Sequence, residues 1–329
     1  MTRWSESLPD MPSNALSEIF RGERMRNIFF ILVIVITVAS AGISEGAERY
    51  VTTGIGKLQG DTTYRIGGRI YGPGSGIGAG DYPFPISELE FDINIYMLSL
   101  GGGVKFANDW DFSLTFKKSF TSGDGNLKDS DYMNSSIPDI YSESDAQLDA
   151  WSADINLNYR FLEGLYVGIG YLYQNFDYDV RDFRQWYPLW DYAAGESIGG
   201  IYGPGLGITY DVRYHIPYLE IGAKGHISDE ISIDTNLRYS PMVVAKDRDN
   251  HVARAIYSAG DCKGRAFLWT LKGRYDFPKN WFMTLEFDYT RINTSGDSKN
   301  YINEEWQWTI DQETESSQMY FTFMAGYRF

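Results

Sequence analysis

The stretch Trp151–Phe161, "WSADINLNYRF", alternates apolar and polar residues without a break. Its odd positions, from Trp151 to Phe161, are apolar or aromatic, and its even positions, from Ser152 to Arg160, are polar or charged. Successive side chains of a β-strand point to opposite faces, so a period of two predicts a strand with one apolar face and one hydrated face.

The same pattern recurs in "ISIDTNLRY" (231–239), "WFMTLEFDYT" (281–290) and "QMYFTFMAGYRF" (318–329), which ends on the aromatic Phe329. Strands of soluble sandwiches also alternate, but a final aromatic residue on such a strand is typical of bacterial outer-membrane barrels. The pattern therefore favours a membrane β-barrel over a soluble sandwich.

Turn residues divide the chain into ten strands, and an even number is what single-chain outer-membrane barrels require. We predict strands over residues 49–63, 87–107, 110–123, 147–162, 165–183, 205–227, 231–251, 255–277, 281–296 and 316–329. Tight connections are expected near Asn108, Glu163, Ser228 and Pro278, with long loops at the other end. Short turns on one side and long loops on the other are typical of these barrels, whose long loops face outside the cell.

Several predicted strands are longer than the ~9–11 residues that cross a bilayer. The fold class is therefore all-β, a ten-stranded antiparallel transmembrane β-barrel whose strands extend beyond the membrane on the extracellular side. A barrel this narrow is filled by its own side chains. Polar residues at inward positions can pair across the lumen, which makes a solute channel the least favoured function.

The N-terminal region resembles an export signal. Arg26 precedes an apolar run from Ile28 to Val38, which ends at the small residues Ala39–Ala41. A run this short is typical of a signal peptide and not of a membrane-spanning helix. We expect residues 1–41 to be an extension and signal peptide that is removed, with Met25 as an alternative start, and residues 42–329 to form the barrel.

The composition limits the classes of partner and cofactor that this chain is expected to bind. The formal charge is −15 and there is one cysteine, Cys262. An acidic chain does not suit nucleic acid, and one cysteine cannot form a Cys-rich zinc site, so no metal or other cofactor is expected. Bulk acidity fits solubility or a cationic partner attracted to an acidic site.

Two acidic motifs stand near outer strand ends. In "KDRDNHVAR" (246–254), Asp249 and His251 are two residues apart, and in "NLKDSDYMNSSIPD" (126–139), Asp129 and Asp131 have the same spacing. Residues two apart share a face of a strand. A carboxylate beside an imidazole, opposite two coupled carboxylates, fits general-base activation of water. Either motif alone is more often a solvated loop or a loose calcium ligand.

The chain resembles the omptins, outer-membrane endoproteases of Gram-negative bacteria. The resemblance rests on "DSDYMNSS" (129–136), "QLDAWSADINL" (147–157), "RYHIPYLEIG" (213–222) and "LRYSPMVVAKDRDNH" (237–251), which occur in family order, and it covers roughly residues 54–329.

This resemblance implies a vase-shaped barrel, acting as a monomer, that hydrolyses cationic peptides or proteins at the cell surface. Its active site would face outside, with Asp129 and Asp131 opposite the dyad of Asp249 and His251. It also implies a substrate-binding role for Asp247 before the cut and for Glu143 after it. Lipopolysaccharide is implied as an activator.

The chain departs from the family pattern in two places. Tyr64 stands where a second acidic residue would contact the basic side chain, with Asp61 three positions earlier. Arg213 matches one lipopolysaccharide-binding position, but Asp177 occupies another.

Strict alternation conflicts with these roles on one strand. Odd positions up to Tyr239 are the lipid-facing ones, yet Asp249 and His251 are odd too. A bulge shifts the register by one, and proline is tolerated at bulges. We therefore predict an irregularity between Ser240 and Asp247, near Pro241. A different class of function also stays open, that of a catalytically silent barrel acting as an adhesin through its aromatic loops.

Overall fold

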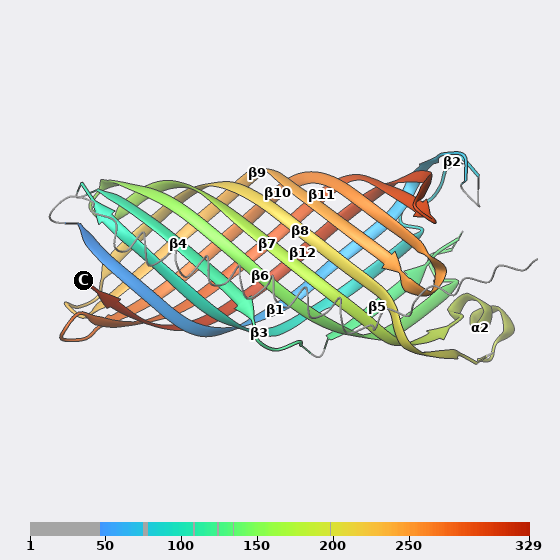
Figure 1. Cartoon of the computed structure of the whole chain (residues 1–329), viewed down its shortest axis with the longest axis horizontal. Coiled ribbons are helices and arrows are strands. Elements are labelled where there is room, and N and C mark those ends of the chain that lie inside the picture. The colour runs from blue at the N-terminus through green and yellow to red at the C-terminus, as the bar shows by residue number, and fades with distance from the viewer. Residues whose placement is uncertain (1–46, 75–77, 108, 124, 134, 198) are drawn as a thin grey trace, which may run out of the picture. The chain divides into compact units, whose positions relative to one another are not determined.

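The structure is a computed structural model, and it describes residues 47–74, 78–107, 109–123, 125–133, 135–197 and 199–329. All of the described residues belong to one compact unit. The expected signal peptide, residues 1–41, lies outside the described residues. The compact unit is a β-sheet that closes into a ring (Figure 1).

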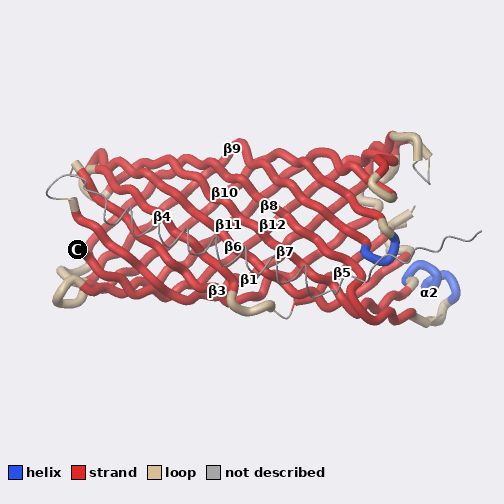
Figure 2. The backbone as a smooth tube through the Cα atoms, viewed as in Figure 1, coloured by secondary structure: helices blue, strands red, loops and turns tan. Residues whose placement is uncertain are grey.

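Long strands make up nearly all of this unit (Figure 2). They are β1 (Glu48–Tyr71), β2 (Gly80–Asp81), β3 (Ser87–Phe106), β4 (Trp110–Ser119), β5 (Gly125–Asp131), β6 (Ile140–Leu162), β7 (Leu165–Trp186), β8 (Ile201–His226), β9 (Ile231–His251), β10 (Ile256–Asp276), β11 (Trp281–Ile302) and β12 (Glu305–Arg328). The short helix α2 (Pro188–Ala194) lies between β7 and β8, and the 3₁₀ turn η1 (Val252–Arg254) lies between β9 and β10. No helix in the described part of the chain is long and apolar enough to cross a membrane.

Backbone pairing joins the long strands that the structure describes into a closed ring. The order runs from β1 through β12 and back to β3, and β1 pairs with both β12 and β3 in antiparallel register. β4 and β5 occupy one position, because each pairs with β3 on one side and β6 on the other. β2 only extends the edge of β1, so the twelve strands fill ten positions around the barrel, as the sequence predicts.

The two ends of the barrel differ as expected, with one correction. Tight connections such as Glu163–Gly164 and Phe277–Asn280 lie at the end that carries the C-terminus (Figure 1). The predicted long loop over residues 297–315 was wrong. β11 and β12 continue through this region and are joined by Asn303 and Glu304, with φ of 50° and 67°. Positive φ at both residues of a two-residue hairpin matches a type I′ turn.

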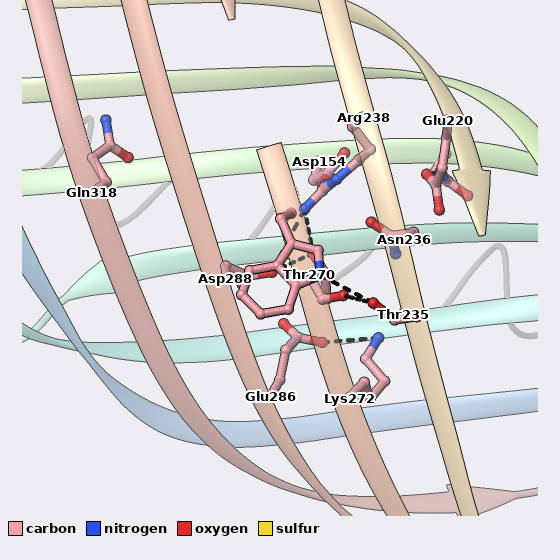
Figure 3. Close-up of polar contacts among 12 residues, drawn as sticks. Asp154, Glu220, Thr235, Asn236, Arg238, Thr270, Lys272, Glu286, Asp288 and Gln318 are labelled. Carbon is pink, nitrogen blue, oxygen red and sulfur yellow. Dashed lines mark hydrogen bonds and ion pairs between the residues drawn. The ribbon is translucent and has the colours of Figure 1, made fainter. Parts of the chain in front are cut away.

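The end of the barrel with tight turns is apolar outside and polar inside. Exposed outward residues include Ile169, Leu219, Leu285 and Phe321, which matches the apolar band of a membrane barrel. Inside, Arg238 reaches across the lumen to Asp154, with 2.9 Å between Nη1 and Oδ2 (Figure 3). On the adjacent strands β10 and β11, Lys272 also pairs with Glu286, at 2.8 Å between Nζ and Oε2. The pairing across the lumen that the sequence predicts is therefore present.

The other half, which carries α2 and β5 and is called the rim half here, has the opposite arrangement (Figure 1). Its outward positions on β6, such as Glu143 and Asp145, are exposed and charged, whereas the inward Ala146 and Leu148 are buried. Tyr64, Phe91, Tyr178, Tyr210 and Tyr214 belong to the same buried cluster. A strand segment surrounded by water needs its apolar core inside, so the rim half resembles a soluble barrel.

The predicted irregularity in β9 is confirmed. Ser240 pairs with Ala266 of β10, and Val243 pairs with Gly264, so β9 has one extra residue at Pro241–Met242. The pairing with β8 shows the same extra residue. Below it, Leu237 and Tyr239 are exposed, and above it, Ala245, Asp247 and Asp249 are buried. One bulge thus turns the odd positions of β9 from the outside to the inside.

Deleting Met242 tests this register. The deletion would remove the extra residue and exchange the inward and outward positions of residues 243–251, so we expect the variant to lose the folded, heat-modifiable band on unheated gels. Met242→Ala keeps the residue count and changes a side chain that is 64% exposed, so we expect it to fold like the parent. A deletion variant with the parent's melting temperature would contradict the assigned register.

Candidate functional site

The carboxylate–imidazole pair lies at the top of β9. Because of the bulge below it, Asp249 points inward and is buried. Its Oδ2 atom lies 3.1 Å from Nε2 of His251, the last residue of the strand. Asp249 therefore orients the ring of His251, as the spacing predicts.

Asp129 and Asp131 were expected in a loop, and the structure corrects this. Both belong to β5, where Leu127, Asp129 and Asp131 alternate with the outward Asn126 and Lys128. Asp129 pairs with Leu89 of β3 and with Ser142 of β6. A strand fixes both carboxyl groups on the inner wall more firmly than a free loop would.

The two motifs come from opposite parts of the ring, because β6, β7 and β8 separate β5 from β9. Burial raises the pKa of Asp129, and the charges of Asp131 and Asp249 raise it further. Burial also raises the pKa of Asp131, while the charges of Arg254 and His251 lower it. The charge of Asp249 thus acts on Asp129, and the charge of His251 acts on Asp131, although the pairs belong to different strands.

Asp247 lies one inward position below Asp249. Its Oδ2 accepts hydrogen bonds from Nε2 of Gln312 and, at 3.5 Å, from Oγ1 of Thr314. Burial raises its pKa to about 7, with smaller contributions from Asp249 and Asp211. Its Oδ1 and Oε1 of Gln312 are buried and make no hydrogen bond to any residue that the structure describes.

Gly260 of β10 pairs with Asp247 and allows its carboxylate to lie close to the backbone. A Cβ atom at this glycine would lie 2.6 Å from both carboxylate oxygens and 2.5 Å from Oε1 of Gln312. The glycine therefore lets three acceptor oxygens gather at one point on the inner wall.

Three other residues were named from the sequence, and only Tyr64 lies close to Asp247. Tyr64 is buried, and its ring packs edge-on against Tyr210 with 5.8 Å between centroids. Burial and the charges of Asp247 and Asp249 raise the pKa of Tyr64, so it contributes a neutral phenol. Asp61 alternates with the buried Thr62 on the outward side, and Glu143 is exposed on the outer face of β6. The structure does not bring Glu143 or Asp61 to this wall.

Arg254 was not identified from the sequence. It ends η1, and its Nη2 atom lies 2.6 Å from Nδ1 of His251. Arginine only donates hydrogen bonds, so Nδ1 accepts and the neutral ring carries its proton on Nε2, facing Asp249. The sequence signal that would have identified Arg254 is a positive charge three residues after His251, within a short turn.

Comparison with known families agrees with the fold. The sequence matches the Omptin family over residues 51–329. The chain belongs to this family. A search of curated proteins found no significant match.

Among solved structures, this omptin is similar to the outer membrane protease OmpT from Escherichia coli, with a TM-score of 0.72 and 19% identity over 86% of this chain and 97% of that one. The translocator domain of the autotransporter NalP from Neisseria meningitidis matches at a TM-score of 0.37 and 11% identity, over 96% of this chain and 98% of that one. OprG from Pseudomonas aeruginosa matches at 0.39 and 8% identity, over 86% of this chain and 96% of that one. Only the similarity to OmpT is close enough to support the fold.

The rim of this omptin thus gathers four carboxyl groups, one imidazole and one guanidinium. Such a set is able to orient a water molecule, remove its proton and share a proton between the coupled Asp129 and Asp131. Oδ1 atoms of Asp129 and Asp249 are buried without a hydrogen bond to any described residue. Buried acceptors of this kind cost stability, and functional sites commonly carry such costs.

The raised pKa of Asp129 has a consequence for stability. The folded protein holds the proton of Asp129 more tightly than the unfolded chain, whose carboxyl titrates near ~3.9. Its contribution to stability is therefore largest at acid pH and falls as pH rises from about 4. We expect Asp129→Asn to melt a few degrees higher than the parent at pH 9, with a smaller difference at pH 4.5, measured by thermal unfolding in detergent.

Asp261→Asn provides the control, because it removes one carboxylate from an exposed position on β10. It should leave the pH dependence of melting unchanged. A lower melting temperature for Asp129→Asn at pH 9 would show that the buried carboxylate stabilises the rim.

Proposed function

We propose that this omptin is an endopeptidase of the outer membrane that hydrolyses cationic peptides or proteins at the cell surface with an activated water. The observation that carries the proposal is the Asp249–His251 pair within electrostatic reach of Asp129 and Asp131 on a distant strand. Membership of the family and the fold shared with an outer membrane protease support it.

His251 acts as the general base in this proposal. Asp249 holds the proton of Nε2 and stabilises the charged ring, so Nδ1 takes the proton from water. The water oxygen bonds to the scissile carbonyl carbon, and the electron pair of the C=O bond moves to its oxygen. When the C–N bond breaks, His251 returns the proton to the leaving amine. Asp129 and Asp131 share a proton and position the water or the carbonyl group, so no acyl-enzyme forms.

The difference between the two ends of the barrel supports a site that faces one particular side of the membrane. Outer-membrane barrels have short turns on the periplasmic side and longer loops outside. The Asp–His pair lies at the end opposite the tight turns, above the apolar band. This supports an active site that faces outside the cell, reached by substrates without crossing the membrane.

A basic side chain of the substrate fits the group around Asp247. The unpaired Oδ1 of Asp247 and Oε1 of Gln312 are acceptors, and they have no carboxylate partner at Tyr64. One buried carboxylate that is partly protonated near neutral pH binds a cation less strongly than two would. We therefore propose a moderate preference for lysine or arginine before the cut, with no role for the outward Glu143.

Of the basic residues that the omptin resemblance implies for binding lipopolysaccharide, Arg213 is present, and it lies on the outer face. Arg213 already pairs with Asp211, with 2.6 Å between Nη2 and Oδ1. The nearby Asp177 would repel phosphate. Activation by lipopolysaccharide is therefore proposed as weak, and we propose that the barrel acts as a monomer.

A catalytically silent barrel that acts as an adhesin is the alternative. α2 exposes Trp190 and Tyr192, which are 63% and 75% accessible, and exposed aromatic residues anchor many interfaces. Binding without cleavage of any cationic peptide would favour this alternative.

The dyad is tested by cleavage of a peptide library rich in lysine and arginine, with refolded barrel in detergent, with and without lipopolysaccharide. We expect Asp249→Asn and His251→Ala to lower kcat by at least about 100-fold, because general-base catalysis contributes ~10²–10⁴. Asp261→Asn should cleave like the parent. Full activity of either dyad variant would contradict the mechanism.

Substitutions at the Asp247 group should separate specificity from chemistry. We expect Asp247→Asn and Gly260→Ala to lower kcat/KM for cleavage after lysine or arginine by roughly 10- to 100-fold, the effect of one hydrogen bond to a charge. Cleavage after neutral residues should change little. Equal losses on both substrate types would show that Asp247 does not bind the basic side chain.

A further inference from the structure

Arg254 lies where the two motifs meet. Its guanidinium contacts His251, with 2.6 Å between Nη2 and Nδ1. The charge of the same group lowers the pKa of both Asp129 and Asp131. A residue from the β9–β10 turn thus acts on β5, four positions away around the ring.

The contact occupies the atom that the reaction needs. Nε2 of His251 faces Asp249, so Nδ1 holds the lone pair that takes a proton from water. A water molecule takes that place only when the guanidinium turns away. Arg254 is partly free to turn, because its side chain is exposed at the end of η1.

The negative charge that forms during the reaction indicates where the guanidinium of Arg254 moves. Attack by water places a negative charge on the carbonyl oxygen, beside the carboxylates of Asp129, Asp131 and Asp249. Repulsion from these groups would raise the barrier unless a donor with positive charge lies next to the oxyanion. The neighbouring Arg248 does not supply it, because it is stacked on the ring of Tyr257 on the outward face, at 4.2 Å from the centroid.

We propose that Arg254 is a further catalytic residue, which turns from Nδ1 of His251 to the carbonyl oxygen of the scissile bond and stabilises its negative charge. This inference rests on the proposed peptidase function. The water then occupies the position beside Nδ1, loses its proton to that nitrogen and bonds to the carbonyl carbon. The displaced electron pair resides on the oxygen next to the guanidinium until the C–N bond breaks and the amine receives the proton from His251.

Kinetics of Arg254→Ala and Arg254→Lys on one cationic peptide test the proposal. We expect Arg254→Ala to lower kcat by about 10²–10³-fold, the usual effect of removing one oxyanion donor, with KM changed by no more than a few-fold. Arg254→Lys should recover part of the loss. Added millimolar guanidinium should increase kcat of the alanine variant and leave the parent unaffected.

Arg248→Ala is the matched control, since it removes a guanidinium from the same hairpin but from its outward face. It should retain the parent's kcat. The folded band on unheated gels shows that each variant has formed the barrel. An alanine variant at position 254 with unchanged or higher kcat would overturn the proposal, because the arginine would then be a bystander or an inhibitory cap.

The state of His251 gives a reading that does not depend on activity. We expect ¹⁵N NMR of the labelled imidazole to show an unprotonated Nδ1 in the parent and a loss of that preference in Arg254→Ala. No such difference would contradict the contact itself. A parent that shows the contact but cleaves no peptide would instead contradict the proposed function.

Discussion

Closure of the hydrogen-bonded ring between β1 and β12 is the constraint on which the rest of the structure depends. Within a bilayer, every backbone N–H and C=O group needs a partner in the protein. The pairing from Tyr50 with Arg328 to Tyr71 with Thr309 supplies these partners along most of both strands. Once the ring is closed, each residue has only two directions, inward or outward. The medium outside then decides which residue types are tolerated on each face.

The two halves of the barrel meet this constraint in opposite ways. In the band with the apolar exterior, charged residues fill the lumen, and Arg238 links Asp154 to the opposite wall. In the rim half, tyrosines and aliphatic residues fill the interior and charges face water. The charged residues of the lumen line a cavity of about 250 Å³ below the rim. The ion pair of Arg238 with Asp154 links β9 to β6, which are not neighbours in the ring.

The bulge at Pro241–Met242 lies on β9 between the two halves and reverses which positions of this strand face inward. Without it, the odd positions of β9 that face lipid would continue outward, and Asp247 and Asp249 would face water outside the barrel. With it, both are buried on the inner wall. The cost is an acidic cluster in which Asp129 and Asp247 have raised pKa values and some carboxylate oxygens are buried without a hydrogen bond to any described residue. Arg254 partly offsets that charge in the free protein.

The sequence by itself determined the fold class, all ten predicted strands in outline and the two acidic motifs, because a period of two is a local property of each segment. Resemblance to the omptins assigned roles to Asp129, Asp131, Asp249 and His251. Because the lipid-facing residues and the proposed site residues of one strand both fall on odd positions, the sequence also located the bulge. The sequence missed β5 and the extended ends of β11 and β12. In the extended end of β12, "DQETESS" (311–317), both faces carry polar residues, so the alternation that marks a strand fades. Only the tertiary structure decided that Gln312, Gly260 and Arg254 adjoin the motifs and that Glu143 does not. Those neighbours depend on register across the ring, which no single segment records.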